Sequence, residues 1–301
     1  MADVQRAAPE PSSRREYTLV VAVADLGSVE QLMRTAIDLA TAHDGSILVV
    51  SVIHKTAGSP FRLFSDDRIK AEFSEGRREV LDRAVEAAAD APVPVEDRLL
   101  VGTDVAETIL TAVGDADADG LLLGWQTRPR PSDIVLGTTV DPVIRRAPCD
   151  VFVERVGTTA DGVDAILLPT VGGPHVEPAT DLVAAVATAN DATATVVSYV
   201  SPSADETERA AAREHAESAS SQLPDVPVEG GVRESDDIAG SVVTAAADHD
   251  LVVLGATRER RFRRRVVGSV AETVSRRADP PVVIAKRRSE GTLFSSVFDR
   301  W

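Results

Sequence analysis

Two loops of this 301-residue sequence have the residue types and the spacing of an anion-binding site. In each loop a glycine is followed, 13 residues later, by a second glycine and a small hydroxyl residue: Gly124 with Gly137 and Thr138, and Gly255 with Gly268 and Ser269. A glycine at the end of a strand lets the backbone approach a ligand, and the start of a helix offers amide donors to a phosphate. The same residues could simply cap helices. Because the spacing occurs twice, we favour phosphate binding, present or ancestral.

Other chemistry-bearing residues do not indicate catalysis. His175 follows Gly172-Gly173-Pro174 at an expected strand-to-helix turn, where ligands bind, but no second histidine, cysteine or paired acid lies near it in the sequence. Neither Gly-x-Ser-x-Gly nor Gly-x-x-x-x-Gly-Lys-Ser/Thr occurs. The single cysteine, Cys149, excludes an internal disulfide and a cysteine-based zinc site, and we interpret it as a core residue. We therefore expect neither an enzyme nor a metal-binding protein.

Two further segments could contact a partner. Arg258–Arg265 contains six arginines and one glutamate, a local charge of +5, and Arg128 and Arg130 are a thinner counterpart in the first half. This patch could bind phosphates, an acidic protein or anionic lipid, or it could be a solvated loop. The tail Leu293–Trp301 would place five large apolar residues on one helix face. It could pack on its own domain or dock on a partner or membrane surface.

The composition limits the class of protein. The net charge is 32 − 48 = −16, which argues against a general nucleic-acid binder. Only three of the 32 basic residues are lysine, and such an acidic, lysine-poor surface is similar to that of cytosolic proteins from salt-loving organisms. No apolar run approaches the roughly 18 residues of a membrane helix, and residues 1–16 lack the apolar region of a signal peptide. We expect a halophilic cytoplasmic protein with a disordered N-terminal arm.

The first half of the chain alternates apolar, β-branched runs with helical patterns, which is typical of a parallel α/β sheet. Strands are expected at Thr18–Val23, Ser46–Ile53, Val95–Val101, Leu121–Gly124 and Val151–Glu154. Helices are expected at Val29–His43, within Ser65–Ala89, and at Val105–Val113 and Thr138–Arg146. Five strands separated by helices predict one doubly wound, Rossmann-like domain.

The second half repeats this order. Strands are expected at Ala165–Pro169, Thr193–Val200, Val226–Val232, Leu251–Gly255 and Val282–Lys286. Helices are expected at Glu177–Asn190, Asp205–Ser221, Ile238–His249 and Ser269–Arg277. Leu121–Gly124 matches Val252–Gly255 residue by residue, so the halves are duplicates. We predict two tandem domains, residues 17–156 and 163–287, between an arm at 1–16 and an amphipathic tail at 288–301.

Over nearly all of residues 17–287, the duplicated five-strand pattern with its glycine-spaced loop resembles the universal stress protein family. In ATP-binding members the loop has a middle glycine three residues after the first, where this sequence has Thr127 and Arg258. The family's first strand typically ends in Pro-Val-Asp-Gly, whose aspartate contacts adenine. Here Val171 and Ala24 stand at that position, and Asp25 follows one residue later.

The resemblance implies a non-catalytic stress-response or regulatory binding module. The alternative is a protein that binds ATP or AMP, with at most slow ATP hydrolysis. Its nucleotide would be held by the loop residues named above: Gly124, Gly137, Thr138, Gly255, Gly268 and Ser269, with Arg258 adding charge. The resemblance also implies an internal pseudo-dimer that pairs through the final strands, Val151–Glu154 and Val282–Lys286, and a homodimer is a further option.

Three segments are similar to paired stress-protein domains that are appended to amino-acid transporters of salt-loving archaea: Leu123–Trp125, Arg145–Val151 and Leu167–His175. This similarity suggests that the partner is a membrane transporter or another regulated protein.

Overall fold

The computed structural model describes residues 16–56, 58, 64–126, 136–158, 162–256 and 268–288. In the first half, these residues form five strands and five helices: β1 (Thr18–Ala22), α1 (Leu26–Ala42), β2 (Ser46–His54), α2 (Asp66–Glu72), α3 (Glu75–Ala87), β3 (Val95–Gly102), α4 (Val105–Asp115), β4 (Gly120–Trp125), α5 (Val140–Arg146) and β5 (Asp150–Arg155). In the second half, the described residues form five strands and four helices: β6 (Ala165–Pro169), α6 (Val176–Asn190), β7 (Thr193–Val200), α7 (Glu206–Ser220), β8 (Val228–Glu234), α8 (Ile238–Ala246), β9 (Leu251–Gly255), α9 (Ser269–Arg277) and β10 (Val282–Lys286).

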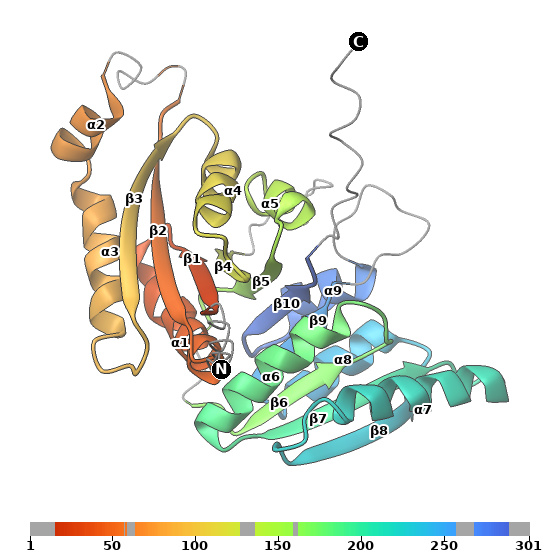
Figure 1. The fold of residues 1–301 in the computed structure, drawn as a ribbon. Helices are drawn as coiled ribbons and strands as arrows, with labels where there is room; N and C mark the ends of the chain where they lie inside the picture. Colours follow the sequence, from red (N-terminus) through yellow and green to blue (C-terminus); the bar gives the residue numbers. More distant parts are fainter. Residues whose placement is uncertain are drawn as a thin grey trace, which may run out of the picture.

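All ten of these strands belong to one sheet, in the order β3-β2-β1-β4-β5-β10-β9-β6-β7-β8 (Figure 1). The second five strands repeat the order of the first five in reverse, as expected for two copies related by a twofold axis. Pairing is parallel within each half. Two apolar clusters cover the sheet: α1, α3, α6 and α7 pack on one face, and α4, α5, α8 and α9 on the other. The predicted doubly wound α/β architecture is confirmed.

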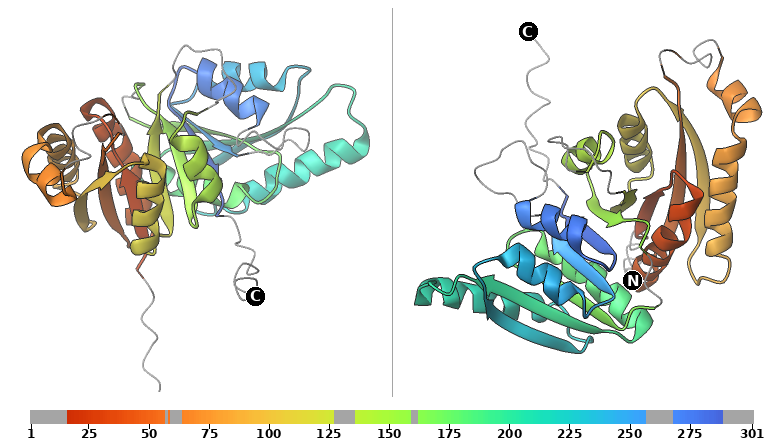
Figure 2. Two further views of the ribbon diagram at one scale, coloured as in Figure 1. Left: turned by 90° about the horizontal axis from the view of Figure 1, so that it is seen from above. Right: turned by 180° about the vertical axis from the view of Figure 1, so that it is seen from behind.

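The two halves meet where β5 and β10 pair antiparallel, between the first half on one side and the second half on the other (Figure 2, left). Glu154 faces Val283 and Val151 faces Lys286 in the register of this pair. A parallel sheet that ended at β5 or β10 would expose unpaired backbone donors and acceptors. The pairing removes both open edges, and the predicted pseudo-dimer is confirmed.

Some predicted boundaries are wrong. The segment Ser65–Ala89 is two helices, because Phe73 has a non-helical backbone (φ −131°) and stacks on Phe64 with ring centroids 5.7 Å apart. The helix predicted from Thr138 begins at Val140, with Thr139 at its N-cap position. By contrast, five elements of the second half have the predicted bounds: β6, β7, β9, α9 and β10. Apolar runs that cross a buried sheet leave little room for a shift in register.

Charged side chains are buried where the two halves join. Arg155 donates to the backbone oxygens of Asp279 (3.0 Å) and Pro280 (2.6 Å), just beyond the end of α9, and to Ser275 O (3.2 Å) within its last turn. These carbonyls are natural partners for a cation, because the C-terminal end of a helix carries partial negative charge. One first-half side chain therefore holds a helix terminus of the second half.

Glu154 lies next to Arg155 and is 2% exposed. Its carboxylate accepts hydrogen bonds from Gln31 Nε2 (2.7 Å) and Thr35 Oγ1 (2.8 Å), both on α1. Burial raises the pKa of Glu154 to about 7, although these two hydrogen bonds oppose the rise. Helix α1 in turn lies beside α6, where His43 Nε2 is 3.0 Å from Asp181 Oδ2.

The raised pKa of Glu154 makes stability depend on pH. The folded protein keeps the proton up to about pH 7, whereas the unfolded chain releases it near pH 4.5, so this group loses its stabilising contribution as the pH rises through 7. We therefore expect the free energy of unfolding of Glu154→Gln, relative to that of the original chain, to rise by up to about 3 kcal/mol from pH 5 to pH 8. Urea unfolding at the two pH values measures this difference. Glu79→Gln, at an exposed site on α3, is the control, and an equal pH response of both variants would contradict the prediction.

Candidate functional site

A cavity of about 380 Å³ opens at the carboxyl ends of β6, β7 and β9. Its walls come from the loop between β6 and α6, from the end of β7, from α8 and from the first turn of α9: Leu168–Val176, Ala179, Tyr199, Ile238, Val242, Leu254–Ala256 and Gly268–Ala271. Open α/β sheets bind ligands at this edge, because the loops that follow the strands surround a crevice there.

The structure brings three of the predicted site residues to this cavity. Gly255 ends β9, Gly268 is the N-cap of α9, and Ser269 is the first residue of that helix. The backbone of Gly268 is extended (φ −68°, ψ 161°), as is usual for an N-cap residue. Helix α9 begins at this point, and the start of a helix carries partial positive charge, which suits an anionic group. The fourth predicted residue of this half, Arg258, lies outside the described residues.

The loop between β6 and α6 depends on glycine. Gly172 has φ +72° and Gly173 has φ +90°, values that side chains other than glycine rarely adopt. A Cβ atom on Gly172 would also lie 2.5 Å from His215 Cδ2 on α7. Thr170 closes the turn, since its Oγ1 accepts a hydrogen bond from Gly172 N (3.1 Å).

His175 is placed at the other end of this loop, at the N-cap position of α6. Its Nδ1 accepts a hydrogen bond from Arg287 N (3.2 Å), directly after β10. The Cβ atom of His175 packs against Gly255, where an added Cβ would approach it to 3.3 Å. The imidazole thus connects the cavity wall to the end of the strand that joins the two halves.

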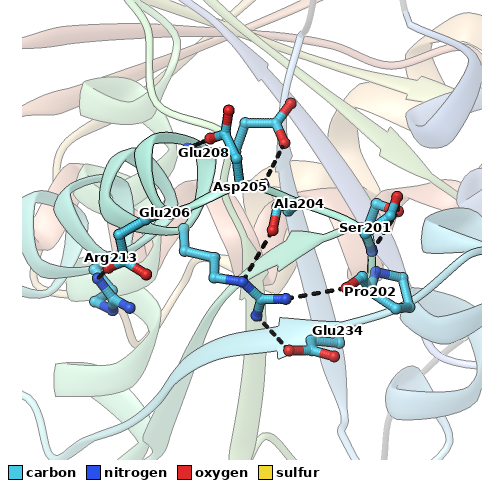
Figure 3. Close-up of polar contacts among 10 residues, drawn as sticks. Ser201, Pro202, Ala204, Asp205, Glu206, Glu208, Arg213 and Glu234 are labelled. Carbon is cyan, nitrogen blue, oxygen red and sulfur yellow. Dashed lines mark hydrogen bonds and ion pairs between the residues drawn. The ribbon is translucent and has the colours of Figure 1, made fainter.

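Helix α7 carries His215, which lies beside Gly172 of the loop. Polar contacts around Asp205 and Glu208 fix the start of that helix (Figure 3). Arg209 donates to the backbone oxygens of Ala204 (3.2 Å) and Pro202 (3.1 Å) and forms an ion pair with Glu234 of the edge strand β8. Asp205 and Glu208 form a reciprocal capping box at the first turn. The sequence alone did not predict this support for the cavity.

The described lining is mainly apolar. Val171, at the position where the resembled family has its adenine-contacting aspartate, is 53% exposed. Thr170, His175, Tyr199 and Ser269 are the polar side chains among the described lining residues, and that part of the lining contains no carboxylate. The cavity can therefore take a flat apolar group, with an anionic end at the start of α9. Sequence reasoning missed Tyr199, Ile238 and Val242, although their location at strand ends or helix starts was a signal.

The corresponding residues of the first half lie away from this cavity. Gly124 is the next-to-last residue of β4 and lies beside the side chains of Val156 and Leu32. Gly137 has φ +113°, and Thr138 precedes α5. Asp25 is the N-cap residue of α1, where its backbone oxygen accepts a hydrogen bond from Ser28 Oγ (3.0 Å).

Several predicted features fall outside the described residues: Thr127, Arg128, Arg130, the patch Arg258–Arg265, the tail Leu293–Trp301 and residues 1–15 of the arm. Cys149 is described and buried, as predicted. Within the described ranges, no helix is both long and apolar enough to cross a membrane. The same part of the chain brings together no group of three or more potential metal-binding histidine, cysteine, aspartate or glutamate residues.

Comparison with known proteins agrees with the fold and its duplication. The model of the universal stress protein family matches residues 17–155 and again residues 162–286. This chain belongs to the universal stress protein family. A family member from Staphylococcus saprophyticus is 27% identical over 143 residues, which are 46% of this chain and 83% of that protein.

Solved structures show the same fold. A universal stress protein from Archaeoglobus fulgidus superposes with a TM-score of 0.60 at 15% identity, over 90% of this chain and 97% of that one. The cytoplasmic domain of a prokaryotic cation chloride cotransporter gives 0.57 at 10% identity, over 91% and 97%. Another A. fulgidus universal stress protein, solved with dAMP, matches 46% of this chain and 96% of its own at 22% identity, with a TM-score of 0.34.

The strain at Gly172 gives a stability prediction. We expect Gly172→Ala to lower the free energy of unfolding by about 1–3 kcal/mol, because the new Cβ makes the positive φ that the loop requires unfavourable and also meets His215. Gly76→Ala is the matched control, since Gly76 lies in α3 with open space around its Cβ position and helices favour alanine. Urea unfolding compares the two variants. Equal stability of Gly172→Ala and the original chain would contradict the prediction.

Proposed function

We propose that this universal stress protein is a non-catalytic regulatory module that binds a small ligand in the cavity of its second half. The observation that carries the proposal is the combination of an apolar chamber with the start of α9 at its edge, where Ser269 is exposed. A ligand with a flat apolar part and an anionic group fits both. The proposed domains are residues 17–156 and 163–287.

The histidine contacts support a binding function over catalysis. His43 is paired with Asp181, His175 accepts from the backbone of Arg287, and His249 contacts Thr195 Oγ1 (2.9 Å). Each of these imidazoles connects separate structural elements.

An adenine nucleotide is the second candidate ligand, with at most slow hydrolysis of ATP. It is favoured because Gly255, Gly268 and Ser269 converge on one cavity, the arrangement that the glycine-spaced loop predicts. Arg258 would add positive charge for phosphates. The exposed Val171 weakens this candidate, because a valine side chain cannot accept a hydrogen bond from the adenine amino group.

The regulated target is proposed to be a membrane transporter or another protein, with the module in the cytoplasm. The shared fold of a cotransporter's cytoplasmic domain is consistent with this function. The net charge of −16 supports a halophilic, salt-rich setting, where acidic surfaces remain soluble.

Calorimetry of the full chain at high salt tests the proposal with three probes: ATP, AMP and 8-anilinonaphthalene-1-sulfonate, which joins an apolar ring system to an anion. Binding of the dye supports the apolar cavity, and ATP or AMP binding supports the nucleotide candidate. A nucleotide dissociation constant weaker than about 1 mM, which corresponds to about −4 kcal/mol, contradicts the nucleotide candidate. Failure of all three probes contradicts the proposed binding function.

If adenine enters the cavity, an acid at position 171 should strengthen its binding. We expect Val171→Asp to bind AMP about tenfold more tightly, a gain of about 1.4 kcal/mol, because the carboxylate can accept a hydrogen bond from the base. Calorimetric titration with AMP measures the change. Val85 is also exposed but lies on α3, so Val85→Asp controls for the added charge. Unchanged or weaker binding in Val171→Asp would place adenine elsewhere.

A further inference from the structure

The two halves share one fold but differ at the site of the cavity. Gly124 at the end of β4 corresponds to Gly255 at the end of β9, because both begin a glycine-spaced loop. The next residue is Trp125 in the first half and Ala256 in the second. This pair allows the two sites to be compared position by position.

Trp125 is packed into the first half. It is 7% exposed and belongs to the apolar cluster that also contains Leu123, Leu136 and Val140. Its counterpart Ala256 lines the cavity of the second half. An indole therefore lies where the second half has only a methyl group, and it fills space on the α4 and α5 side of the sheet.

The opposite face of the first half is filled as well. A Cβ atom on Gly124 would lie 3.0 Å from Val156 Cγ1 and 3.3 Å from Leu32 Cδ1, and both of these side chains are buried. Gly255, by contrast, is part of the cavity wall. Side chains thus fill both faces of the sheet around Gly124, whereas around Gly255 only the His175 side is in close contact and the Ala256 side borders the cavity.

The loops that begin each half differ in length. Three residues, Val23–Asp25, connect β1 to α1, whereas six residues, Thr170–His175, connect β6 to α6. The short loop is held down by Val23, whose N–H donates to Val50 O (2.9 Å) and whose carbonyl accepts from Ser51 Oγ (3.0 Å). The longer loop turns outward through Gly172 and Gly173 and forms one wall of the cavity.

We infer that each chain binds one ligand, in the second half, and that the first half is a packed scaffold whose corresponding site is closed by Trp125. This inference rests on the proposed function. It assigns specificity to the residue after the first loop glycine: a small residue leaves the chamber open, and a large aromatic residue fills it.

The test transfers the first-half residue to the second half. In the full chain, ATP and 8-anilinonaphthalene-1-sulfonate are titrated by calorimetry against the original protein, Ala256→Trp and the control Trp125→Phe. We expect one site per chain, at least tenfold weaker binding in Ala256→Trp, and unchanged stoichiometry and affinity in Trp125→Phe. Circular dichroism and thermal unfolding establish that each variant is folded. If Ala256→Trp does not fold, the smaller Ala256→Leu replaces it with the same expectation.

The outcomes separate the two proposals. Two equivalent sites per chain, or full binding by the folded Ala256 variants, would overturn the one-site inference and leave the proposed binding function intact. Loss of binding in Trp125→Phe with normal folding would also overturn it, since the ligand would then occupy the first half. Failure of ATP, AMP and the dye to bind the original protein would overturn the proposed function and this inference together.

Discussion

The antiparallel contact between β5 and β10 is the interaction on which the rest of the structure depends. Among the described residues, each half ends its parallel sheet at its last strand and has no further strand of its own to cover that edge. Pairing the two edges satisfies their backbone groups and continues both apolar layers from one half into the other. The helices α1 and α6 are thereby brought together, with His43 and Asp181 in contact between them.

This contact buries ionisable side chains, and their partners restrict how the halves can join. Arg155 reaches carbonyl groups of the other half, and Glu154 is held by two side chains of α1. A slip in the register of β5 against β10 would move Arg155 away from these carbonyl groups and leave its charge unpaired in a low-dielectric interior. Arg155 and its carbonyl partners therefore help to fix how the two halves are arranged.

Duplication conserves the sheet and lets the loops diverge. The strands are constrained by backbone pairing and by apolar contacts on both faces, so both copies keep the same order. The loops at the carboxyl ends have no such constraint, and the first copy carries a short loop and Trp125 where the second carries a glycine-rich loop and Ala256. One wall of the cavity continues to the joint through the contact between His175 and Arg287.

The sequence by itself determined the α/β class, the duplication and most strand bounds, because β-branched apolar runs at regular intervals have few other ways to be buried. It also located Gly255, Gly268 and Ser269 at the edge where ligands bind. It did not reveal the split of the helix at Phe73, which depends on a stacking contact with Phe64. Only the tertiary structure showed that the second copy of the loop borders a cavity. That outcome depends on whether side chains distant in sequence, such as Val156, Leu32 and His215, fill or border the space beside each glycine.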